Sequence, residues 1–194
     1  MGTELLNQLE ALVNSATNEI ERQTYRAQWA CALARFGQTE SARSQIEALR
    51  SYNASYEPRL TAWIFLAEGL ADHFESLSAT AADRFRRAHG LAIALGDAEM
   101  RSLAAAWMGA SEHLLGRYEE ACTRAAEAIS HAPATGTLAL SRAHLVLADC
   151  LYGFGAEVLA LKHFAKARHF AIEARDISMQ SARACPEFCV RGIA

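Results

Sequence analysis

The sequence predicts an all-α fold built from about four repeated helix pairs. Proline and glycine are scarce, at 3 and 11 of 194 residues, so long helices are seldom interrupted. Apolar residues recur at the three- and four-residue spacing that places side chains on one helix face. A pattern of small and large residues also returns at a nearly constant step, which indicates stacked repeats.

Each repeat contains a triplet in which a small residue is followed by an apolar residue after four positions and another, usually small, after three more. The triplets are Ala42, Ile46 and Leu49; Ala81, Phe85 and Ala88; Ala121, Ala125 and Ala128; and Ala160, Phe164 and Ala167. Their first residues are 39, 40 and 39 positions apart. We predict that the small residues lie where a second helix crosses closely.

An apolar stretch precedes each triplet and predicts the first helix of the pair. At its centre stand a large and a small residue: Trp29 and Ala30, Leu66 and Ala67, Met108 and Gly109, and Leu147 and Ala148. Gly37, Gly116 and Gly155 lie five residues before their triplets, where glycine can turn the chain with a positive φ. The second unit lacks this glycine, and two extra residues predict a slightly longer turn there.

In chain order, we expect helices at residues 3–14, 18–36, 39–51, 58–74, 79–95, 98–115, 118–131, 138–154 and 157–175. Asp97 and Thr137 are the predicted N-caps of the sixth and eighth helices. The first helix is either an N-terminal cap or half of an incomplete unit. We expect a further helix to begin after residue 175 and to be stopped by Pro186. An array cut short in this way would be expected of a fragment of a longer protein.

Residues 105–133 resemble the tetratricopeptide repeat, whose pattern is W-x2-L-G-x2-Y, then A-x3-F-x2-A and a proline. The matching residues are Met108, Gly109, Gly116, Arg117, Tyr118, Ala121, Ala125, Ala128 and Pro133. The resemblance extends over four units, at residues 23–57, 58–97, 98–136 and 137–176, with caps at 1–20 and 177–194. It implies one domain, 1–194, folded as a right-handed superhelical α-solenoid of about four such repeats.

The repeat step is longer than the 34 residues of the usual tetratricopeptide unit. In this respect the chain is similar to the arrays of bacterial signalling proteins, which often sit beside the effector of a transcription activator or a diguanylate cyclase. The aromatic residue usual at the centre of the first helix is also replaced here, by Leu33, Leu70, Glu112 and Leu151.

Composition argues against several classes of protein. The formal charge of −3, from 19 basic and 22 acidic residues, is not typical of a nucleic-acid-binding protein. No apolar run reaches the roughly 20 residues of a membrane helix, and the first residues lack a secretory signal, so we expect a cytoplasmic protein without membrane contact. The five cysteines, with Cys185 and Cys189 as the only close pair, do not form a redox or metal motif.

No catalytic, cofactor-binding or metal-binding motif is present, so the sequence predicts no enzyme, no cofactor and no metal site. His163 and His169 are six residues apart and lie on different helix faces. Arg84, Arg86 and Arg87 belong to a solvated helix face or, less favoured, to a patch for an anionic partner. Trp63 is expected in the core, and Trp107 either faces the groove or is buried against the next unit.

The resemblance also implies a concave groove lined by fixed positions of each first helix. The candidate partner-binding residues at these positions are Arg35, Glu68, Asp72, His113, Arg142, Asp149 and Tyr152. The three carboxylates favour an apolar or basic peptide, although an ordinary wet surface explains the same residues nearly as well.

The expected function is protein–protein interaction, in which a peptide or helix of a partner is held in the groove. The alternative is a sensory or dimerisation module of a larger bacterial regulator, with a homodimer formed through a terminal repeat. A deep acidic groove would favour the first function. An exposed apolar face at the C-terminal end would favour the second.

Overall fold

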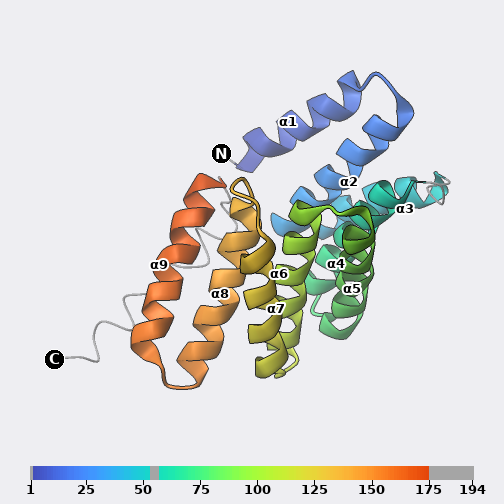
Figure 1. Cartoon of the computed structure of the whole chain (residues 1–194). Coiled ribbons are helices and arrows are strands. Elements are labelled where there is room, and N and C mark those ends of the chain that lie inside the picture. Colours follow the sequence, from blue (N-terminus) through green and yellow to red (C-terminus); the bar gives the residue numbers. More distant parts are fainter. Residues whose placement is uncertain (1, 53–56, 175–194) are drawn as a thin grey trace.

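The computed structural model describes residues 2–52 and 57–174, which form nine α-helices and no strand (Figure 1). The helices are α1 (Gly2–Ser15), α2 (Glu19–Arg35), α3 (Thr39–Ser51), α4 (Pro58–Phe74), α5 (Ser78–Leu95), α6 (Ala98–Leu114), α7 (Tyr118–His131), α8 (Thr137–Gly153) and α9 (Glu157–Glu173). The all-α prediction is confirmed, and each predicted boundary lies within two residues of the observed one. The predicted cap at 177–194, with Cys185, Pro186 and Cys189, lies outside the described residues.

Helices that follow one another in the chain pack against one another, so that α2 to α9 form a row in sequence order (Figure 1). The first helices of neighbouring pairs also touch, α2 against α4 and α6 against α8. Helices α4 and α6 touch only sparsely. Helix α1 packs on α2 and buries Leu6 and Val13. It runs along one side of the row, with its N-terminal end toward α8 and α9 (Figure 1).

The triplet residues form the core between paired helices, as predicted. Every member of the second and third triplets is fully buried. Helices α6 and α7 approach so closely that a Cβ added to Gly109 would lie 3.1 Å from the carbonyl oxygen of Ala121. The small residues at this crossing therefore allow direct contact between two backbones.

The turns within the four helix pairs share one conformation. In three of them glycine has a positive φ, namely 76° at Gly37, 75° at Gly116 and 76° at Gly155. In the second turn Ser76 takes the same place with φ 65°, and the N–H of Leu77 donates to the carbonyl of Asp72 at 2.8 Å. The prediction of a longer second turn is wrong, because α4 ends at Phe74 and α5 begins at Ser78, the same spacing as in the other turns.

Replacing Ser76 by glycine is expected to stabilise the protein by about 1 kcal/mol, because a side chain with a Cβ is strained in the left-handed region. The free energy of unfolding in urea measures the gain. Ser44→Gly, in the interior of α3, is the matched control and should lose about 0.5–1 kcal/mol. A loss of stability in Ser76→Gly would contradict the turn geometry.

The two predicted N-caps have different outcomes. Asp97 caps α6, and its side chain accepts a hydrogen bond from the N–H of Met100 at 3.0 Å. Thr137 is not a cap, because α8 already begins at this residue and Gly136 holds the N-cap position without a side-chain bond. The preceding turn is closed by the N–H of Gly136, which donates to the carbonyl of Pro133 at 2.8 Å.

Candidate binding pocket

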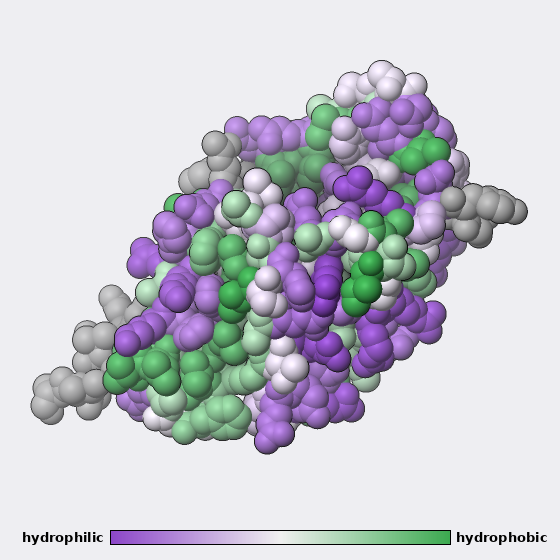
Figure 2. Space-filling model, viewed as in Figure 1, coloured by the Kyte–Doolittle hydropathy of each residue, from purple (hydrophilic) through white to green (hydrophobic). Residues whose placement is uncertain are grey.

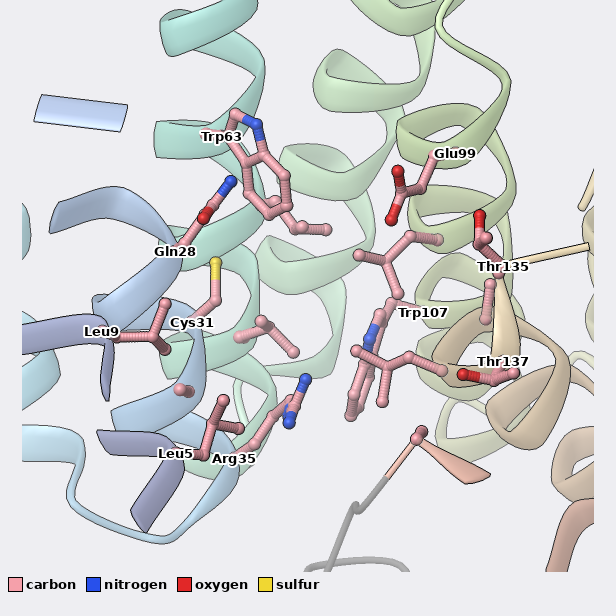
Figure 3. Close-up of a pocket in the computed structure, with 18 of the residues that line it drawn as sticks. Leu5, Leu9, Gln28, Cys31, Arg35, Trp63, Glu99, Trp107, Thr135 and Thr137 are labelled. Atoms are coloured by element: carbon pink, nitrogen blue, oxygen red, sulfur yellow. The ribbon is translucent and has the colours of Figure 1, made fainter. Parts of the chain in front are cut away.

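A pocket of about 400 Å³ lies on the side of the molecule where α1, α2, α4 and α6 face one another (Figure 3). The connection between α7 and α8 closes a further side, and Ala174 at the end of α9 reaches the same space. Leu5 and Leu9 of α1 contribute to the wall, so the pocket includes the N-terminal helix as well as the repeated pairs. Its volume is in the range of pockets that bind small ligands or single peptide side chains.

The pocket wall is largely apolar and aromatic. Two indoles, Trp63 on α4 and Trp107 on α6, line it together with leucines from four helices. Trp107 is buried, and its Nε1 has no hydrogen-bond acceptor within the described part of the chain. An indole N–H that is buried without an acceptor carries a free-energy cost of about 1–3 kcal/mol.

The polar residues of the wall are few. Arg35 and Arg59 are its cations, and Glu99 is its anion. Gln28 adds a neutral amide, and Thr135 and Thr137 add hydroxyl groups (Figure 3). Arg59 also lies 3.4 Å from the carboxylate of Asp97. The pocket is therefore not acidic, in contrast to the groove that the sequence predicts.

Side chains behind Trp107 hold its indole in place. The guanidinium of Arg142 lies 3.8 Å from the ring centroid, and the His73 and Phe74 rings contact the indole edge-on at 5.2 and 5.7 Å. Burial and, secondarily, the charge of Arg142 lower the pKa of His73 to about 4. His73 is thus neutral near pH 7, and its Nδ1 lies 3.1 Å from the hydroxyl of Ser111.

Cys31 is the sulfur-containing residue of the pocket wall, and it contributes a neutral thiol. Burial raises the pKa of this thiol to about 12. A thiol with such a pKa is a poor nucleophile and a poor metal ligand near neutral pH, because both roles require the thiolate. Among the described residues, no cluster of three histidine, cysteine, aspartate or glutamate side chains could hold a metal ion.

Of the seven predicted partner-binding residues, Arg35 lines the pocket and the others do not. Glu68 and Asp72 are each only 3% exposed, so the prediction that they lie open on a groove wall is wrong. Leu66 and Leu70, two residues earlier in each case, line the pocket instead. Two residues correspond to about 200° of helix rotation, so the two carboxylates lie on the opposite face of α4.

Glu68 and Asp72 form a buried ion-pair cluster with arginines of the neighbouring helices. Arg84 of α5 contacts both carboxylates, with 2.7 Å from its Nε to Asp72. Arg50 of α3 lies 2.7 Å from Glu68, and Arg43 lies 2.5 Å from Asp72. These bonds join α3, α4 and α5, so the two acidic residues serve packing rather than binding of a basic peptide.

The arginines of the basic cluster on α5 also form ion pairs within the chain. Arg86 pairs with Asp83 and lies 3.9 Å from Glu112, and Arg87 pairs with Asp83. All three arginines of the cluster, including Arg84, therefore have carboxylate partners within the chain. This favours a solvated helix face over a patch for an anionic partner.

The remaining candidates lie apart from the pocket. His113 contacts the ring of Tyr118 at the α6–α7 turn, Asp149 is half-buried on α8, and Tyr152 is exposed near the end of α8. Arg142 does not line the pocket, but its guanidinium packs on the ring of Trp107, which does. The prediction thus missed Trp63 and Gln28 as wall residues, although tryptophans on two first helices were a usable signal.

A pair of histidines joins α8 to α9. The Nδ1 atoms of His144 and His163 are 3.0 Å apart, and His144 stacks on the ring of Phe170. Burial, with the nearby His163 and Lys166, lowers the pKa of His144 to about 4. Burial and Lys166 also lower the pKa of His163.

The lowered pKa values of these two histidines predict that the folded protein loses stability in mild acid. An unfolded histidine binds its proton near pH 6.5, whereas folded His144 does so only near pH 4. The unfolded state is therefore favoured progressively as the pH falls from 6.5 to 4. Urea unfolding at several pH values should show this decline, and His144→Gln should reduce its slope. An equal slope in both proteins would contradict the effect of burial.

The comparisons with known proteins do not assign the chain to a family. No protein-family model matches the chain, and no curated protein shows significant sequence similarity to it. None of the helices in residues 2–52 and 57–174 combines the length and apolarity needed to cross a bilayer.

Proposed function

We propose that the chain is a protein-interaction module that holds a peptide or helix of a partner in the pocket between α1, α2, α4 and α6. We further propose that its four helix pairs form a right-handed, tetratricopeptide-like solenoid. Equivalent turns at residues 37, 76, 116 and 155 and buried triplets at equivalent positions support this arrangement.

The observation that carries the proposed function is the chemistry of the pocket wall. Two indoles and several leucines offer a site for one or two large apolar side chains. Arg35 and Arg59 favour an acidic rather than a basic residue next to the apolar anchor.

Selection of displayed random peptides against the full chain tests the proposed function. We expect the enriched peptides to share one or two large apolar residues with an acidic neighbour. Gln28→Trp, which places a bulky ring in the pocket, should weaken their binding by roughly tenfold or more, about 1.4 kcal/mol. Ser44→Trp, on the exposed surface of α3, is the matched control and should leave the dissociation constant unchanged.

Two results would overturn the pocket assignment. One is a selection that enriches no peptide. The other is a set of selected peptides that bind wild type and Gln28→Trp equally, because such peptides would bind another surface.

The pocket lacks the acidic wall that would favour the first function. One observation favours the alternative function, a sensory or dimerisation module of a larger regulator. Large apolar side chains are exposed at the α8–α9 end of the molecule, among them Phe154 and Val158. Sedimentation velocity of the full chain over a wide concentration range distinguishes the two functions. Dimers that form with rising concentration would support the alternative, whereas a monomer at every concentration would support the peptide-binding module.

A further inference from the structure

Helix α9 carries an exposed apolar stripe on its outer face. Val158 is 70%, Leu161 45% and Ile172 56% exposed. These residues and the exposed Ala165 follow a spacing of three, four and seven, which places them on one side of the helix. His169 lies on the same side between Ala165 and Ile172, and its Nε2 is 3.3 Å from the carboxylate of Glu173. Figure 2 shows hydrophobic residues gathered at this end of the molecule, where α9 begins.

Basic side chains flank the stripe and are not paired. Lys162, Lys166 and Arg168 are all exposed, and none of them makes an ion pair within the described part of the chain. On α3, α5 and α7, by contrast, every arginine has a carboxylate partner; these are Arg43, Arg50, Arg84, Arg86, Arg87 and Arg124. The second helix of the last pair thus differs from its three counterparts.

The repeat shows which part of the equivalent face is covered elsewhere in the chain. Arg168 follows Ala160 by eight residues, as Arg50 follows Ala42, and Arg50 pairs with Glu68 of the next helix, α4. Ala82 of α5 holds the position of Leu161 and is buried. The positions of Val158, Ala165 and Ile172 are exposed in α5 as well, where they hold Ala79, Arg86 and Ile93. In the earlier pairs the following helix therefore covers only the edge of this face that holds Leu161 and Arg168.

From the exposed apolar side chains of α9 and the unpaired positive charge beside them, we propose that the outer face of α9 binds an acidic amphipathic helix of a partner protein. The partner's apolar stripe packs on Val158, Leu161 and Ile172, and its glutamates or aspartates pair with the flanking bases. A second copy is less suitable, because an antiparallel pair of α9 helices centred on Ala165 would bring the basic residues of both copies together. The surface shares no residue with the pocket, so it stands independently of the peptide-binding function. It includes Val158, so it competes with the dimer of the alternative function.

A labelled synthetic peptide tests the proposal by fluorescence anisotropy with the full chain. The peptide is an amphipathic helix with leucines at alternating third and fourth positions and glutamates on both flanks. A second peptide, with lysine in place of each glutamate, is its control. We expect the glutamate peptide to bind and the lysine peptide to remain free.

Variants of the chain locate the bound peptide. Lys162→Glu/Arg168→Glu should weaken binding by roughly tenfold or more, and Leu161→Asp should weaken it as well. Arg22→Glu/Arg87→Glu makes the same change in net charge at the half-buried Arg22 of α2 and the exposed Arg87 of α5, and it should leave binding unchanged. Circular dichroism of each variant confirms that the helices remain folded.

The proposal is overturned if the glutamate peptide does not bind, or if the α9 and control variants bind it equally. A concentration-dependent dimer that Leu161→Asp dissociates, without peptide binding, would assign the face to a second copy instead. Binding to vesicles of anionic lipid, again without peptide binding, would assign it to a membrane surface.

Discussion

Replacing Glu68 by arginine is expected to prevent the chain from folding. Glu68 is buried on α4 between the guanidinium groups of Arg50 and Arg84. A third guanidinium at this position would bring like charges together where little water can screen them. The milder Glu68→Gln removes the charge and leaves the arginines without this partner, at an expected cost of about 3 kcal/mol. Thermal unfolding and urea unfolding measure both effects.

Glu119→Arg is the control for this prediction. Glu119 is exposed in the first turn of α7, so reversal of its charge should change stability by no more than about 0.5 kcal/mol. A Glu68→Arg protein that unfolds at the wild-type temperature would show that the three-helix ion-pair cluster does not exist. Such a result would return Glu68 to an open groove, as the sequence predicts.

Gly69→Ala is expected to destabilise the protein by about 2 kcal/mol, because α4 and α5 approach too closely here for a methyl group. A Cβ at this position would lie 2.6 Å from a ring carbon of Phe85. The ring has little room to withdraw, because it is fully buried and stacks on Trp107 with a centroid distance of 6.1 Å. The free energy of unfolding in urea measures the loss.

The same substitution at Gly90 should have the opposite sign. Gly90 lies inside α5, and a Cβ there would meet no atom within 4 Å. Alanine should therefore stabilise the helix by up to about 1 kcal/mol through its higher propensity. Stabilisation in both variants would contradict the close contact at Gly69. Partial rescue of Gly69→Ala by Phe85→Leu would support it.

Helices, turns and core positions could be predicted from the sequence because they depend on local pattern. The spacing from Ala121 to Ala125 and Ala128 identifies a buried face without knowledge of what covers it. Gly116 marks a turn because few other residues adopt a positive φ. Ser76 does not follow this rule, because the packing of α4 and α5 imposes the turn conformation there without a glycine.

The candidate site depends on tertiary arrangement and was mostly not predictable. The resemblance assigned Glu68 and Asp72 to the groove wall. In the structure the wall positions lie two residues earlier, and the two carboxylates are buried in the interior. The pocket also uses Leu5 of α1 and Thr135 before α8, two segments outside the repeated pattern. No periodicity within the repeats shows that these segments meet.

The tryptophan fluorescence of a Trp29→Phe variant, titrated with a selected peptide, tests most directly whether the pocket binds the partner. The chain has three tryptophans, and the two that remain, Trp63 and Trp107, both line the pocket. Binding in the pocket predicts a saturable change in their emission at one peptide per chain. A peptide that binds, by anisotropy, while the emission stays constant would contradict the pocket as the binding site.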